Sequence, residues 1–234
     1  MTRAYYASDI GCQRPHNEDR CLSVPERALF AVADGMGGQA AGEVASSLLV
    51  ETLREELLPV PRIGEEELCR GVLRANERIL REAELHPERR GMGTTATVLH
   101  IEGGVAWWAH VGDSRLYLSR RGRLQQVTRD HSYVEELVSR GELTEEEARN
   151  HPQKNMLLRA VGVEGDLSVD TGSFPLEQGD VLLLATDGLT NMVGDESIGK
   201  VLRENGEEPA RALVQQALAA GGSDNVTVVV VVFD

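Results

Sequence analysis

The last strand-like segment of this chain constrains its fold more than any other part of the sequence. From Val226 to Val232 the chain reads Val-Thr-Val-Val-Val-Val-Val. Successive side chains of a strand point to opposite faces of a sheet, and a strand that is apolar on both faces needs a protein layer on each side. We therefore expect this segment in the interior of a sheet that is covered on both faces.

Two pairs of helices are available to cover such a sheet. Apolar side chains recur at helical spacing in four segments, at about residues 44–57, 65–85, 196–204 and 208–220. Prolines at 59 and 61 follow the first segment, and Gly221-Gly222 ends the last. Strands are expected in groups between these helix pairs, without regular alternation of strand and helix. This order favours antiparallel sheets covered by helices in a single domain, residues 1–234.

One segment does not fit the core of such a fold. Residues 133–149 are acidic and only weakly apolar, with a helical pattern that Gly141 interrupts. Segments of this polarity usually run over the surface and carry function. We therefore predict a surface insertion, or flap, at about residues 131–165.

Charge and cysteine content narrow the class of protein. The 24 Lys and Arg residues against 38 Asp and Glu residues give a net charge of −14, which argues against nucleic acid or an anionic membrane as the main partner. The three cysteines form no CxxC pair and no zinc-like cluster with histidine, so free thiols in a reducing compartment are expected. The sequence has no apolar run of signal-peptide or membrane-spanning length, and we predict a cytoplasmic protein.

Acidic residues follow or precede several apolar strands. The apolar run from Ala28 to Ala33 ends in Asp34-Gly35, and the glycines that follow Asp34 predict a bare loop before the next helix. The run before Asp187-Gly188 repeats the arrangement of a strand followed by Asp-Gly. Asp113 and Asp224 occupy similar strand boundaries, beside Gly or Asn. Each acid alone is explained by an ordinary turn. Together, with Glu18 and Asp19 as further members, they predict a carboxylate cluster that binds hard divalent ions such as Mg²⁺, Mn²⁺ or Ca²⁺.

Seven short motifs make the chain resemble one known family. In chain order they are RPHNEDR, VADGMGG, GMGTTA, HVGDSRLY, TRDHS, LLLATDGL and GGSDNVTVVVV. Their order and spacing resemble those of the metal-dependent serine/threonine phosphatases of type 2C, the PPM family, in its compact bacterial form. The resemblance runs from about Tyr6 to Phe233. It implies an α+β fold, a four-layer α-β-β-α sandwich of two central antiparallel sheets flanked by helix pairs.

The resemblance also implies a role for individual residues. Asp34 would bridge two Mn²⁺ or Mg²⁺ ions, and the carbonyl of Gly35 would reach one of them. Asp187 and Asp224 would hold the other ion. Asp34 and Asp187 would therefore be catalytic.

Four further positions complete the implied site. Glu18 and Asp19 would act mostly through metal-bound waters, and Asp113, with Asp187, would hold a third, weaker ion. Arg14 would bind the substrate phosphate and be catalytic, since a guanidinium fork suits a phosphate group.

The implied reaction is direct hydrolysis. Two ions would activate a bridging hydroxide, which would attack phosphorus in line with the leaving serine or threonine oxygen. The sequence leaves the identity of the general acid open. Eukaryotic members carry a histidine where this chain has Met36, and some bacterial relatives carry one where Gln39 stands. A metal-bound water or His131 could donate the proton, although a structural role for His131 is the simpler interpretation.

The expected activity is a protein serine/threonine phosphatase that opposes a kinase in signalling. Its partners would be phosphorylated proteins, a serine/threonine kinase among them, with no nucleic acid and no membrane, and the protein would be a monomer. Three alternatives stay open: a non-catalytic signalling module with this fold, a phosphatase for small phosphoesters or anti-sigma-type regulators, and a calcium-stabilised structural domain.

Overall fold

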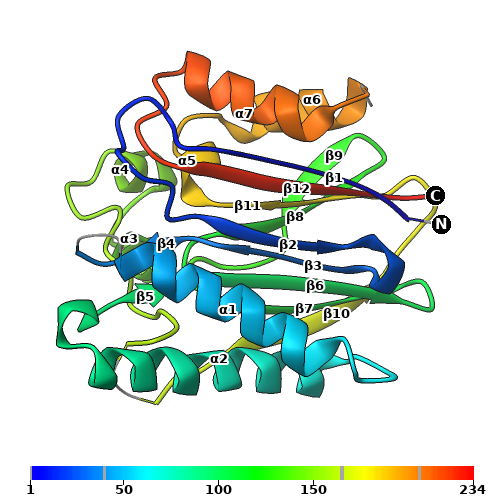
Figure 1. Cartoon of the computed structure of the whole chain (residues 1–234). Coiled ribbons are helices and arrows are strands. Elements are labelled where there is room, and N and C mark those ends of the chain that lie inside the picture. The colour runs from blue at the N-terminus through cyan, green and yellow to red at the C-terminus, as the bar shows by residue number, and fades with distance from the viewer. Residues whose placement is uncertain (1, 39–40, 164–165, 205–206) are drawn as a thin grey trace.

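Two antiparallel sheets face each other between two layers of helices in this computed structural model, which describes residues 2–38, 41–163, 166–204 and 207–234 (Figure 1). The first sheet has the strand order β1 (Thr2–Asp9), β12 (Val226–Phe233), β11 (Val181–Ala185), β8 (Arg115–Arg120), β9 (Arg123–Gln126). The second has the order β10 (Asp170–Pro175), β7 (Val105–Val111), β6 (Ala96–Glu102), β3 (Leu29–Ala33), β2 (Arg20–Val24). The α-β-β-α sandwich is confirmed.

Helices cover the outer face of each sheet. The second sheet carries α1 (Ala41–Leu57) and α2 (Glu65–Leu85), and the first carries α6 (Asp195–Glu204) and α7 (Pro209–Ala219) (Figure 1). Short elements gather at one end of the sandwich: β4 (Gly35–Met36), β5 (Gly93–Thr94), α3 (Tyr133–Ser139), α4 (Glu145–Arg149) and α5 (Asp187–Thr190). The helices predicted at 65–85 and 208–220 agree with α2 and α7 to within a residue at each end.

Three apolar layers hold the four structural layers together. The strand β12 shows why both of its faces had to be apolar. Val228 and Val230 pack against the helices on the first sheet, whereas Val229 and Val231 pack between the two sheets. A third cluster joins α1 and α2 to the second sheet. The prediction that β12 is an interior strand with both faces covered is confirmed.

Local predictions were wrong at two strands. The glycines after Asp34 were expected to form a bare loop, but Gly35 and Met36 form β4, which pairs with β5. The strand β10 was not predicted at all. Its sequence, Asp-Thr-Gly-Ser-Phe-Pro, is only partly buried and lacks apolar alternation. This segment therefore forms a strand because it pairs with β7, not because of a pattern in its own sequence.

The polar segment 131–163 is anchored in the core at both ends. Ser132 pairs with Leu157, and Val161 pairs with Thr94, in isolated bridges. His131, Ser132 and Val161 are buried, although α4 between them has no buried residue. The expectation that the whole segment is too polar for the core was therefore wrong at its ends. Gln39 and residues 164–165 lie outside the described residues.

Candidate active site

The antiparallel topology brings the acids from different parts of the sequence to one end of the sandwich. Asp34 follows β3 and Asp19 precedes β2, and the pairing of Arg20 with Ala33 places both acids at the same end of the second sheet. Asp187 follows β11 and Asp224 lies just before β12, so the antiparallel pairing of these strands places both acids at the same end of the first sheet. The hydroxyl of Thr186 donates to Asp19 over 2.8 Å and joins the two sheets at this end.

Asp34 interacts electrostatically with four other acids of the group. Its pKa is raised well above the ordinary value, first because burial disfavours the charged form. Repulsion from Asp19, Asp187, Asp113 and Asp224 raises its pKa further. The predicted cluster of acids is therefore a real group of interacting carboxylates, because each of these four is close enough to influence Asp34.

Asp19 and Asp187 each carry one carboxylate oxygen without a partner. Both side chains are buried, and one oxygen of each accepts a hydrogen bond, from Thr186 and from Asn191 respectively. The other oxygen, Oδ1 in both residues, is buried and makes no hydrogen bond to the described residues. Burial raises the pKa of Asp19 to about 7 and also raises that of Asp187. A buried, unpartnered carboxylate oxygen is costly unless something binds it.

The segment from Arg14 to Asp19 forms the rim of the cluster. Glu18 is half-buried, and burial raises its pKa against the attraction of Arg14. Arg14 is exposed, and its guanidinium donates to Asp224 Oδ2 over 2.7 Å. Arg14 therefore lies beside the acids, and 48% of its side chain is exposed to solvent.

The remaining predicted acid, Asp113, belongs to the same group. Its pKa is raised well above the ordinary value by burial and by repulsion from Asp187. Arg115 nearby partly offsets this repulsion, while it is itself held by Asp130 through three hydrogen bonds. All eight positions named from the sequence therefore lie at this end of the sandwich or next to it in the chain.

Polar side chains around the acids hold the segments in place. Thr95 Oγ1 accepts the amide of Asp34 over 2.9 Å and bonds to Ser114 over 2.7 Å. Asn225 accepts the amide of Glu18 and donates to the carbonyls of Ile10 and His16. Thr95, Ser114 and Asn225 therefore support the shape of the site. Thr186 and Asn191 were missed, and only the position of Thr186 directly before Asp187 could have drawn attention to it.

The two glycines that follow Asp34 and Asp187 allow close approach of neighbouring backbone. A Cβ added at Gly35 would lie 2.1 Å from the carbonyl oxygen of Gly42, and one at Gly188 would lie 1.9 Å from that of Asn225. These distances are far inside van der Waals contact, and both neighbours are main chain. The glycines therefore let α1 and β12 pack directly against the acid-bearing turns.

Replacing Gly35 with alanine should destabilise the protein by about 2–4 kcal/mol, because the carbonyl of Gly42 cannot move away without shifting α1. Thermal unfolding followed by circular dichroism measures this effect. Gly38→Ala is the matched control, since nothing lies within 4 Å of its added Cβ. Equal melting temperatures for the two variants would contradict the packing argument.

His131 is held by both of its ring nitrogens. Nδ1 accepts the amide of Gly112 over 3.2 Å, and Nε2 lies 3.1 Å from Asp170 Oδ2. Burial lowers its pKa, and the residue is only 7% exposed. His131 thus fixes the backbone just before Asp113, which is the structural role that the sequence suggested.

The donor set fits a hydrated divalent cation. In the described parts of the chain, no group of three or more His, Cys, Asp or Glu side chains is arranged so that it could hold a metal ion. Mg²⁺, however, usually keeps several waters and needs only one or two carboxylates. The unpartnered oxygens of Asp19 and Asp187 and the raised pKa of Asp34 are what such an open cation site provides.

Fold and site together define the class of carboxylate-based, metal-dependent hydrolases. The particular family follows from the sequence, since the model of the protein phosphatase 2C family matches residues 13–221. The chain belongs to the protein phosphatase 2C family.

Individual relatives agree with this assignment. The serine/threonine phosphatase stp of Listeria monocytogenes is 40% identical, over 97% of this chain and 94% of that protein. The serine/threonine protein phosphatase PstP of Mycobacterium tuberculosis is 41% identical, over 95% of this chain and 43% of that protein. A crystal structure of the catalytic domain of PstP, in complex with 2 manganese ions, matches with a TM-score of 0.90 at 39% identity, over 100% of this chain and 99% of that chain.

Proposed function

We propose that this chain is a divalent-metal-dependent protein phosphatase that hydrolyses phosphoserine and phosphothreonine in proteins. The group of buried carboxylates with raised pKa values, next to the exposed Arg14, carries the proposal. The names of the relatives support the specificity for serine and threonine esters. No acid of the predicted set is missing, so nothing favours a non-catalytic module.

Seven positions would hold the metal ions. Asp34 and the carbonyl of Gly35 would serve the core site with Asp187 and Asp224, and Glu18 and Asp19 would bind mainly through water. Asp113, with Asp187, would serve a third ion. When bound, Mn²⁺ or Mg²⁺ supplies Lewis-acid activation of water and offsets charge on the phosphoryl oxygens.

Arg14 would orient the substrate. Its planar guanidinium can donate two parallel hydrogen bonds to a phosphate group, and its exposure leaves these donors accessible. The salt bridge to Asp224 limits the orientations of the side chain beside the acids. Substrate binding therefore involves an arginine that is already near the reacting centre.

The leaving serine or threonine oxygen needs a proton. Met36 cannot donate one, and both ring nitrogens of His131 are engaged with Gly112 and Asp170. Neither residue is placed to act as the general acid, so we assign this role to water.

The segment 131–165 would act as a flap that selects substrates. A cavity of about 290 Å³ extends from Asp113 and Asp187 to α3 and α4. Arg149 and Lys154 line this cavity, as do acids such as Glu135 and Glu145. Substrate residues beside the phosphorylated one would enter it, and acidic substrate side chains would pair there with these two cations.

Removing both cations, in Arg149→Ala with Lys154→Ala, should raise KM for a phosphothreonine peptide with flanking acids about threefold to tenfold, because exposed ion pairs contribute little individually. Turnover of an aryl phosphate should not change, since that substrate has no flanking residues. Arg140→Ala is the matched control, because Arg140 pairs with Glu136 and does not line the cavity. An equal rise of KM for both substrates would exclude this role.

The physiological context is part of the proposal. We expect phosphorylated proteins as substrates, including a serine/threonine kinase, and a cytoplasmic monomer that takes part in signalling. The described parts of the chain contain no helix that is long and apolar enough to cross a membrane.

Phosphate release tests the proposed function. Purified protein should dephosphorylate phosphothreonine peptides when Mn²⁺ or Mg²⁺ is added and should stop when the metal is chelated. Comparing an aryl phosphate, a phosphothreonine peptide and a phosphoserine protein identifies the preferred substrate class. Activity that is absent with every metal and every substrate would overturn the assignment.

A further inference from the structure

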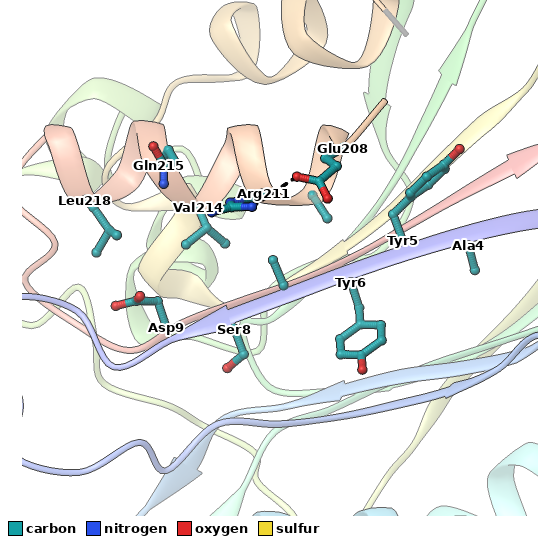
Figure 2. Close-up of a pocket in the computed structure, with 12 residues that line it drawn as sticks. Ala4, Tyr5, Tyr6, Ser8, Asp9, Glu208, Arg211, Val214, Gln215 and Leu218 are labelled. Carbon is teal, nitrogen blue, oxygen red and sulfur yellow. Dashed lines mark hydrogen bonds and ion pairs between the residues drawn. The ribbon is translucent and has the colours of Figure 1, made fainter. Parts of the chain in front are cut away.

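A groove of about 540 Å³ lies between β1 and α7, on the first sheet. All six consecutive residues from Ala4 to Asp9 line it, together with one side of α7 (Figure 2). Alternate residues of a strand point to opposite faces, so six consecutive lining residues mean that the groove follows the edge of the strand itself. The groove is therefore open to the unpaired side of the β1 backbone.

β1 is the least protected edge strand of the two main sheets in the described chain. It has eight residues, and all of them pair with β12 in one continuous register without a bulge. The other three edges are β9 with four residues, β2 with five, and β10, which ends in a proline. Natural proteins shorten, bend or block edge strands that must not pair. β1 has none of these features and carries charges only near its ends.

The hydrogen bonds of Thr227 show which amides of β1 face the groove. Thr227 directs its carbonyl to the amide of Thr186 and its own amide to the Thr186 hydroxyl, so both groups point away from β1. Its partner Ser8 is therefore in a non-hydrogen-bonded pair and points its own amide and carbonyl away from β12. By alternation, Tyr6 and Ala4 do the same. Within the described parts of the chain, the backbone donors and acceptors of these residues have no partner on the side of the groove.

The walls of the groove are apolar and its ends are acidic. Tyr5 points from β1 to the side where α7 lies, and Val214 and Leu218 of α7 line the groove further along, toward Asp9 (Figure 2). Asp9 and Glu208 lie toward opposite ends of the groove. Glu208 is partly neutralised by Arg211, but the chain as a whole carries a charge of −14. A basic ligand is attracted to this surface, whereas a second copy of the chain is repelled.

We propose that the groove along β1 binds an extended peptide segment of another protein, which adds a strand to the first sheet. The segment carries alternating apolar side chains that enter between β1 and α7, and basic residues that reach Asp9 and Glu208. Its main chain pairs with Ala4, Tyr6 and Ser8, as in other cases of strand addition.

Binding of a designed peptide tests this site. The probe is the acetylated and amidated peptide Lys-Val-Thr-Val-Thr-Val-Lys with a fluorescent label, followed by anisotropy. The key variant is Tyr6→Pro, which removes an outward amide without breaking a bond to β12, at an edge position where proline is tolerated. Its matched control is Tyr6→Ala, which loses the same side chain and keeps the amide. Binding should be about tenfold or more weaker for Tyr6→Pro than for Tyr6→Ala.

Amide exchange in the unaltered protein keeps the proposal testable if Tyr6→Pro does not fold. The peptide should slow exchange at Ala4 and Tyr6, while Tyr5 and Ala7 are already protected by β12. A peptide with glutamate in place of both lysines should bind more weakly. Equal binding by the two variants, protection at another surface, or dimers that form through β1 in sedimentation without peptide binding would each overturn the proposal.

Discussion

Replacing Asp34 with asparagine should lower turnover of a phosphothreonine peptide by about a thousandfold, corresponding to the several kcal/mol that metal activation contributes to the barrier. Asp34 interacts with four other acids, so its loss weakens the whole cation site. Initial rates at saturating Mn²⁺ measure the effect. Asp166→Asn, which changes an exposed acid outside the cluster, should keep full activity.

The same variant should unfold at a higher temperature than the unaltered protein when metal is chelated. Burial and repulsion from neighbouring acids disfavour the charged form of Asp34, and asparagine removes this cost because it does not ionise, so the metal-free fold gains stability. An acid with a purely structural role would lose stability instead. Loss of activity together with a lower melting temperature in chelator would therefore contradict the assignment of Asp34 as a metal ligand.

Without metal, the free energy of unfolding should fall as the pH rises from about 4 to about 7. Burial raises the pKa of Asp19 to about 7 from an ordinary value of 3.8, so the folded state holds a proton that the unfolded state has already released. Stability from this proton is complete below about pH 4 and is lost as the pH passes the folded pKa. The loss should be on the order of 2–4 kcal/mol, or about 5–10 °C in melting temperature.

Added metal should reverse this trend. A divalent cation takes the place of the protons among the acids, so the stabilisation by Mn²⁺ should be larger at about pH 8 than at about pH 5. Thermal unfolding at both pH values, in chelator and in Mn²⁺, measures the difference. Asp19→Asn should flatten the pH dependence in chelator. A chelated protein that is more stable at the higher pH would show that these acids are not buried together.

Local sequence patterns predicted the elements with strong periodicity and the acids at their ends. The strand at Val226 was expected inside a covered sheet because seven residues leave neither face polar. The segment 65–85 agrees with α2 because its apolar positions recur at helical spacing. The positions of Asp34 and Asp187 were apparent because an apolar strand ends at each of them.

Elements that depend on a partner were not predictable in the same way. The strand β10 has no apolar alternation, and it becomes a strand only because β7 offers an unpaired edge. The strands β4 and β5 have two residues each, which is too short for an alternation of apolar and polar side chains to be recognised in the sequence. The buried ends of segment 131–163 carry polar residues such as His131, whose burial depends on Gly112 and Asp170.

The amino-acid sequence alone specifies the apolar strands, the helices that cover them and the acids at the strand ends, because side-chain periodicity and strand termination are local properties. The folded arrangement, in contrast, is the reason that Asp19 and Asp187 each keep a buried oxygen without a partner among the described residues, and that four other acids act on Asp34. It also decided that β1 has a free edge. These properties depend on distances between groups that are far apart in the chain. Antiparallel pairing brings the acids together at one end of the sandwich and leaves β1 at the edge of the first sheet.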